Sequence, residues 1–215
     1  MNGITVPMAI VDFIPVLLFF LAALILQRDL YNKMVKGAFA LLAAGSIMVL
    51  ISGVYKAMWK ILYALNVCDY PALSEAFFPM QAPGFLLVFL SLVAMLARKG
   101  KNGAAPMAAV AAPALFESSL PFVGVQTLGC GGVHWCLFAI ARRMKKPLAC
   151  AMFAVAFVAM LGMGYLSARF DDSSGMHWLA QSVNIVSTGA LLAGVVILNK
   201  SGLGDADALS RGGRA

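Results

Sequence analysis

Long apolar stretches separated by short polar segments make up almost the whole chain. A bilayer core about 30 Å thick needs roughly 20 apolar residues per helix, so each stretch predicts a transmembrane helix. The fourth stretch is the shortest and contains Pro106 and Pro113. The seven predicted spans are Met8 to Gln27, Gly37 to Tyr55, Phe77 to Ala97, Ala104 to Leu120, Pro121 to Ala141, Pro147 to Ala168, and Met176 to Leu198.

The composition excludes a water-soluble protein. The 215 residues are 62% hydrophobic and only 12% charged, whereas a soluble chain carries about a quarter charged residues. We therefore expect an all-α polytopic membrane protein with a single transmembrane domain over residues 1–200. Residues 201–215 are rich in Gly, Ala, Ser and charge, which predicts a disordered cytoplasmic tail.

The basic residues determine the predicted orientation. The net charge is +7, with 16 Lys and Arg residues, and most of them fall in loops on one side of a seven-span chain. Basic loops face the cytoplasm, so we expect the N-terminus outside and the C-terminus inside a multi-pass protein of the plasma (cytoplasmic) membrane. The same loops account for the surplus charge by attraction to anionic lipid. The lipid bilayer is thus an expected partner and nucleic acid is not.

Two further patterns concern the arrangement of the helices. Faint similarities, such as Gly84-Phe-Leu-Leu with Gly189-Ala-Leu-Leu, raise the hypothesis of two similar triplets flanking the fourth helix, a 3+1+3 arrangement. Lys56, Trp59, Lys60 and Tyr63 continue the second helix at helical spacing. We expect this extension to lie above the membrane, with the aromatic rings at the interface and the lysines snorkelling.

Polar residues within the spans give the most information about function, because each is costly in hydrocarbon unless it faces a partner or a water-filled cavity. The seventh span places four of them on one helical face, at spacings of four, three and four residues. Other spans carry polar groups at similar predicted depth. The candidate ligand- or ion-binding residues are Asp12, Gln81, Gln126, His177, Gln181, Asn184 and Thr188.

Asp12 is the most informative of these, since a carboxylate within a span can bind a cation or carry a proton. Its alternative is a solvated Asp near a helix start, stabilised by the helix dipole. For the other residues the alternative is hydrogen bonding between helices, which commonly joins transmembrane bundles. Taken together, they predict a polar cavity that opens outward.

Two classes of function follow from such a cavity. The first is a small-solute or ion transporter, coupled to protons, and the second is a seven-helix receptor or sensor for a small ligand, with a cytoplasmic partner. A lipid-modifying enzyme comes third, because no nucleophile, base and orienting group occur at a recognisable spacing. Cys130 and His134 are too few ligands for a metal or haem site, so no cofactor is expected. The sequence leaves open whether copies form a homo-oligomer.

Overall fold

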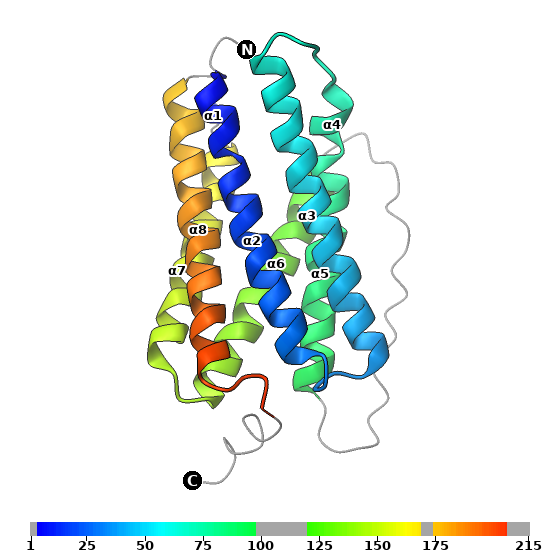
Figure 1. The fold of residues 1–215 in the computed structure, drawn as a ribbon, viewed down its shortest axis with the longest axis vertical. Helices are drawn as coiled ribbons and strands as arrows, with labels where there is room; N and C mark the ends of the chain where they lie inside the picture. Colours follow the sequence, from blue (N-terminus) through cyan, green and yellow to red (C-terminus); the bar gives the residue numbers. More distant parts are fainter. Residues whose placement is uncertain (1–3, 98–119, 169–173, 206–215) are drawn as a thin grey trace.

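The computed structural model describes residues 4–97, 120–168 and 174–205, and every regular element in these ranges is a helix. Figure 1 shows a bundle of long helices that run side by side. The elements are α1 (Val6–Val11), α2 (Phe13–Leu30), α3 (Lys36–Ala64), α4 (Pro71–Glu75), α5 (Phe77–Leu96), α6 (Leu120–Arg143), α7 (Pro147–Ala168) and α8 (Ser174–Lys200).

The helices fit a transmembrane protein. Five helical segments in the described residues are long and apolar enough to cross a membrane, and a sixth, Pro147–Met163 within α7, is apolar but shorter. Leucines on the outer face of α2, such as Leu17 at 59% exposure, have no protein neighbour to cover them, as expected of a side chain in contact with lipid. The predicted fourth span lies outside the described residues, so the number of spans stays a prediction.

The six long helices form a closed ring of two triplets, in which α1–α2, α3 and α5 make the first triplet and α6, α7 and α8 the second. Each helix contacts the next in the order α2, α3, α5, α6, α7, α8, and α8 returns to α2. Within the triplets, α3 contacts α2 and α5, and α7 contacts α6 and α8. Between the triplets, α5 contacts α6 and α8 contacts α2. The 3+1+3 arrangement itself stays a prediction, because a ring of six consecutive helices shows these contacts with or without a repeat.

The helices α5 and α6 run in the same direction, although they are consecutive in the described chain. Gln126 bonds Gln81, and a Cβ placed on Gly129 would lie 2.7 Å from the backbone nitrogen of Leu86. Contacts therefore advance together along both helices. Leu96 and Leu120 lie at opposite ends of the bundle, which is the parity that a seven-span chain needs.

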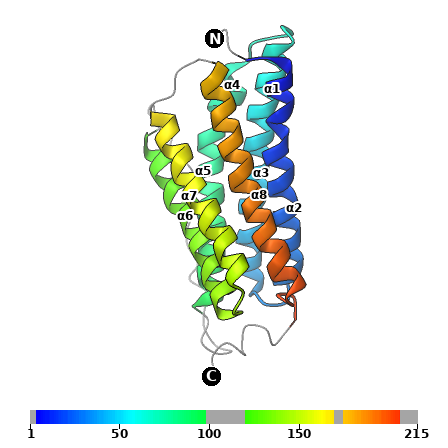
Figure 2. The same ribbon diagram turned by 90° about the vertical axis from the view of Figure 1, so that its left-hand side faces the viewer.

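We name the two ends of the bundle after the carboxylates that they hold. At the Asp12 end lie the starts of α1, α5, α6 and α8, and at the Asp29 end lie the ends of α2, α5, α6 and α8 (Figures 1 and 2). The largest cluster of buried apolar side chains occupies only the half near Asp29. It includes Leu30, Leu42, Leu92, Leu137, Ile140, Phe153, Val195 and Leu198.

Helix α8 ends in a turn that belongs to the folded bundle. The N–H of Leu203 donates to the carbonyl of Leu198, the N–H of Gly202 donates to that of Asn199, and Gly202 has a φ of +80°. This is a Schellman ending, in which glycine takes the left-handed conformation at least cost. Leu203 is fully buried against the core. The turn and its contacts extend to Asp205, and residues 206–215 of the predicted tail lie outside the described ranges, so the disordered tail stays a prediction.

The length of α3 agrees with the predicted continuation of the second helix, but its lysines do not snorkel. The helix runs to Ala64. Lys60 is buried, with a residue exposure of 8%, and Trp59 is equally covered. The expectation of a free extension above the membrane is wrong at these two residues because neighbouring elements cover them: α1 and α4 both contact α3.

Candidate functional site

Asp12 lies at an interruption between two helical segments. Helix α1 ends at Val11 and α2 begins at Phe13, and Pro15 follows in the first turn of α2. Proline has no N–H, so it cannot donate to the carbonyl four residues earlier, here that of Val11. The local sequence thus removes a helical hydrogen bond beside the only carboxylate of the span before Asp29, although Asp12 itself keeps right-handed helical angles and its N–H donates to the Met8 carbonyl.

The carboxylate of Asp12 joins three helices. Its Oδ2 lies 2.5 Å from the Lys60 ammonium on α3, and its Oδ1 accepts a hydrogen bond of 2.7 Å from the side-chain amide of Gln181 on α8. The same amide nitrogen donates to the Met8 carbonyl at 2.8 Å. We call Asp12, Lys60 and Gln181 the Asp12 site.

The charged groups of the Asp12 site are largely removed from solvent. The side chains of Lys60 and Asp12 are only 10% and 13% exposed, and Gln181 is 4% exposed. Removing two charges from water costs several kcal/mol per ion, and close pairing offsets that cost only when the geometry is good. The site is therefore a buried ion pair with a hydrogen-bonded amide, and not the solvated Asp of the alternative interpretation.

A second lysine lies next to this ion pair. Lys56 precedes Lys60 by one turn of α3, and its ammonium lies 4.1 Å from the centre of the Phe77 ring at the start of α5. The charges of Lys60 and Asp12 both act on it. Trp59, on the same turn, donates from its indole nitrogen to Asp69 at 3.0 Å, which fixes the end of α3 to the segment before α4.

Gln81 and Gln126 form a separate pair where α5 and α6 meet. The amide nitrogen of Gln126 donates to the Gln81 oxygen at 2.8 Å. This contact joins the two triplets, as the bond from Gln181 to Asp12 does on the other side of the ring. The structure thus divides four of the predicted residues into two polar contacts near the same end of the bundle.

The remaining predicted residues lie along α8. His177 is buried one turn before Gln181. The Thr188 hydroxyl donates to the backbone carbonyl of Asn184 at 2.8 Å, so it is satisfied within its own helix. Gln181 of the predicted α8 stripe binds groups on another helical segment, and whether the stripe faces a cavity stays a prediction.

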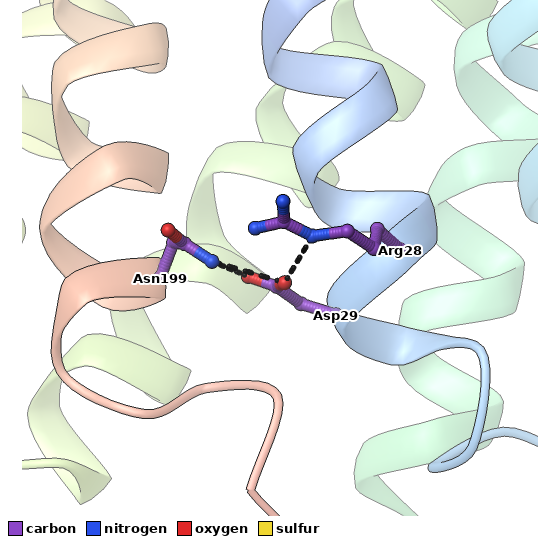
Figure 3. Close-up of polar contacts among 3 residues, drawn as sticks. All are labelled: Arg28, Asp29 and Asn199. Carbon is purple, nitrogen blue, oxygen red and sulfur yellow. Dashed lines mark hydrogen bonds and ion pairs between the residues drawn. The ribbon is translucent and has the colours of Figure 1, made fainter.

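Asp29 forms a second polar contact between α2 and α8, which the sequence did not indicate. The amide nitrogen of Asn199 donates to Oδ1 and Oδ2 of Asp29, at 3.0 and 2.8 Å, and the Nε of Arg28 lies 3.3 Å from Oδ1. Figure 3 shows these three side chains converging at the ends of the two helices. Asp29 is only 6% exposed, although the sequence pattern placed it in a loop.

Lys60, Lys56, Asp29 and Asn199 were thus the residues that sequence reasoning missed. The spacing of Lys56 and Lys60 did place them on one face of an extended helix, but it did not indicate that a carboxylate from another helix covers that face. Asp29 and Asn199 follow their apolar runs directly, so each alone resembles an ordinary loop residue.

Within the described residues no group of three or more His, Cys, Asp or Glu side chains is placed to hold a metal ion. Comparison of the chain with protein families, curated proteins and solved structures gives no match.

Proposed function

We propose that the chain is a proton-coupled transporter of a small solute in the plasma membrane, with its Asp12 end facing outward. The observation that carries the proposal is the buried Asp12–Lys60 pair between predicted membrane spans. Ionisable residues inside spans are rare and commonly mark substrate pathways and proton relays. The outward orientation rests on the basic residues at the Asp29 end, among them Arg142, Arg143 and Lys200.

The chemistry of the pair suits coupling. While Asp12 is ionised, Lys60 and the Gln181 amide both stabilise it. A proton on Asp12 removes the attraction that holds Lys60 and leaves a buried ammonium without its counter-ion. Because an uncompensated buried charge is strongly unfavourable, protonation favours a rearrangement in which Lys60 reaches water or a ligand.

The positions of the polar contacts support a movement between triplets. Gln181 binds Asp12 across the contact of α8 with α2, and Gln126 binds Gln81 across the contact of α6 with α5. Opening the ring at this end requires both bonds to break. In carriers built from repeats, alternating access is largely a rocking of one repeat against the other around a fixed site.

The interrupted first span also fits a carrier. Discontinuous helices expose backbone groups near transporter sites, and such groups are tolerated where protein or a cavity covers them. Here the Met8 carbonyl, in the turn before the interruption, accepts a bond from the Gln181 amide. The same carbonyl accepts the Asp12 N–H, so movement of Gln181 would leave it with its helical partner and would free one acceptor oxygen of Asp12.

The test is flux into vesicles reconstituted with the purified protein and loaded with a pH-sensitive dye. Pools of amino acids, sugars and small carboxylates are added outside in turn, and we expect at least one pool to drive proton movement. Asp12→Asn should lower this flux at least about tenfold, because the neutral side chain cannot carry the proton.

Asp29→Asn is the matched control, since it changes a carboxylate on the same span at the opposite end and should retain most of the flux. The proposal is overturned if no pool moves protons, or if coupled flux survives the combined Asp12→Asn and Asn184→Leu changes.

A further inference from the structure

We infer that the Asp12 site takes a small carboxylate anion that also carries an N–H or O–H donor, such as a hydroxy- or amino-carboxylate. As a statement about the transported substrate this rests on the proposed function, but as a statement about binding it stands on the site alone. Two observations carry it: an unbalanced positive charge and an unpartnered acceptor.

The unbalanced charge comes from Lys56. Lys56 and Lys60 lie beside the carboxylate of Asp12, while the nearby carboxylate of Asp69 accepts from the Trp59 indole at 3.0 Å and pairs with neither lysine, which leaves the charge of Lys56 without a paired carboxylate. Asp12 is already paired with Lys60. Among the described residues no carboxylate lies within ion-pair distance of Lys56, whose ammonium contacts the rings of Phe77 and Phe78.

The aromatic contacts do not neutralise this charge. The ring quadrupole attracts an ammonium, but the charge of the region is unchanged. An anion placed between the two lysines would restore neutrality and gain from both. A cationic ligand would meet two ammonium groups instead, and a neutral ligand would leave the excess charge as it is. Among small solutes, the charge of the site therefore favours anions.

The unpartnered acceptor is the Oε1 of Gln181. Its amide orientation is determined by its neighbours, because the nitrogen contacts two groups that can only accept, the Met8 carbonyl and the Asp12 carboxylate. The oxygen of the same amide is buried and has no hydrogen-bond partner among the described residues. A buried acceptor without a donor is unfavourable, so a ligand that supplies an N–H or O–H would satisfy it.

Together the two features select a bifunctional ligand. Its carboxylate would bind the lysines of α3, and its donor would bind the amide of α8, so it would bridge the two triplets beside Asp12. Binding would then compete with the direct Asp12–Lys60 contact. Because a proton on Asp12 weakens the same contact, ligand binding and protonation would be coupled through it.

The experiment is a binding measurement on the purified full-length protein in detergent, followed by its thermal unfolding. The probes are 2-hydroxy- and 2-amino-carboxylates of three to six carbons, with propionate as a carboxylate lacking the donor, choline as a cation and glycerol as a neutral donor. We expect one or more of the bifunctional carboxylates to raise the unfolding temperature, and propionate, choline and glycerol to have little effect.

Lys56→Gln should weaken this binding at least about tenfold, and Lys56→Arg should restore much of it. Lys36→Gln is the matched control, because Lys36 is an exposed lysine at the other end of the same helix. The inference is overturned if choline or glycerol binds in preference to the carboxylates, if none of the bifunctional carboxylates binds, or if Lys56→Gln and Lys36→Gln behave alike.

The outcome separates this inference from the proposed function. Carboxylates that bind through Lys56 but drive no flux would support the binding site and contradict the transporter. Coupled flux of a cationic or neutral solute that depends on Asp12 but not on Lys56 would support the transporter and contradict the anion site.

Discussion

The first span and its end hold two carboxylates, Asp12 and Asp29, whose partners differ in charge and in exposure. Asp12 is paired with the ammonium of Lys60, whose side chain is only 10% exposed, whereas the charged neighbour of Asp29 is Arg28, whose side chain is 69% exposed. The buried partner of Asp29 is the neutral amide of Asn199. Both carboxylates join α2 to α8, but only Asp12 does so with a buried opposite charge.

The packing around the two carboxylates also differs. The largest apolar core cluster occupies the half of the bundle near Asp29, including the turn at Leu203. Near Asp12 the triplets are joined by the amide bonds of Gln181 and Gln126, beside buried apolar side chains such as Met8 and Phe122. Well-packed apolar cores resist deformation, while a polar contact can exchange one partner for another. On the proposed function, the half near Asp29 stays fixed and the half near Asp12 changes its contacts.

The largest loss of stability is expected when the ion pair at the Asp12 end is broken. Lys60→Met leaves a buried carboxylate without its cation, and we expect a loss of about 3–5 kcal/mol in the free energy of unfolding. Adding Asp12→Leu should recover most of this stability, because it removes the unpaired charge, but should not restore flux. Denaturant unfolding in detergent measures the first effect. A double variant as unstable as the single one would contradict a compensating pair.

The next largest effect concerns the Asp29 end. Asp29→Ala leaves the Asn199 amide without its acceptor in a buried position, which should cost about 1–3 kcal/mol. Because this contact lies in the fixed half, solute-driven proton flux per folded molecule should be nearly unchanged. Flux normalised to folded protein checks this, and a loss as large as that of Asp12→Asn would remove the distinction between the ends.

A smaller loss of stability is expected when either of the two hydrogen-bonded contacts between the triplets is removed. Gln181→Leu removes bonds to Asp12 and Met8, while Gln126→Leu removes one bond to Gln81. Interhelical hydrogen bonds in membranes are worth about 0.6–2 kcal/mol, so the first change should lower the unfolding temperature more. Equal shifts would mean that Asp12 gains little from Gln181.

An effect of comparable size is expected at the turn of the Asp29 end. Gly202→Ala places a Cβ at a φ of +80°, where the left-handed conformation costs about 1–2 kcal/mol for a non-glycine residue. Gly175→Ala near the Asp12 end is the control, because a Cβ there meets nothing within 4 Å. Thermal unfolding of the two variants should therefore differ, with Gly202→Ala the less stable.

The sequence predicted the spans better than the partners of their polar residues. The runs that contain α2, α3, α5, α6, α7 and α8 are recognisable because each is apolar over about the thickness of a bilayer. Asp12 and Gln181 were identified because polar groups inside such runs are unusual. That they bind each other could not be predicted, since contacts between helices distant in sequence depend on packing, which hydropathy does not record.

Lys60 illustrates why the rest was missed. In sequence it follows the apolar part of its helix, and long basic side chains near helix ends usually reach the interface. The structure covers it with α1 and an opposite charge. Asn199 is similar, since it precedes Lys200 at the end of an apolar run and only the return of α8 to α2 brings it to Asp29.

The parallel direction of α5 and α6 has a consequence for how such a protein is made. A triplet has an odd number of helices, so its two ends lie on opposite sides of the bundle, and two triplets of like orientation cannot be joined by a short hairpin. A chain that lost residues 98–119 would have to insert its second triplet upside down.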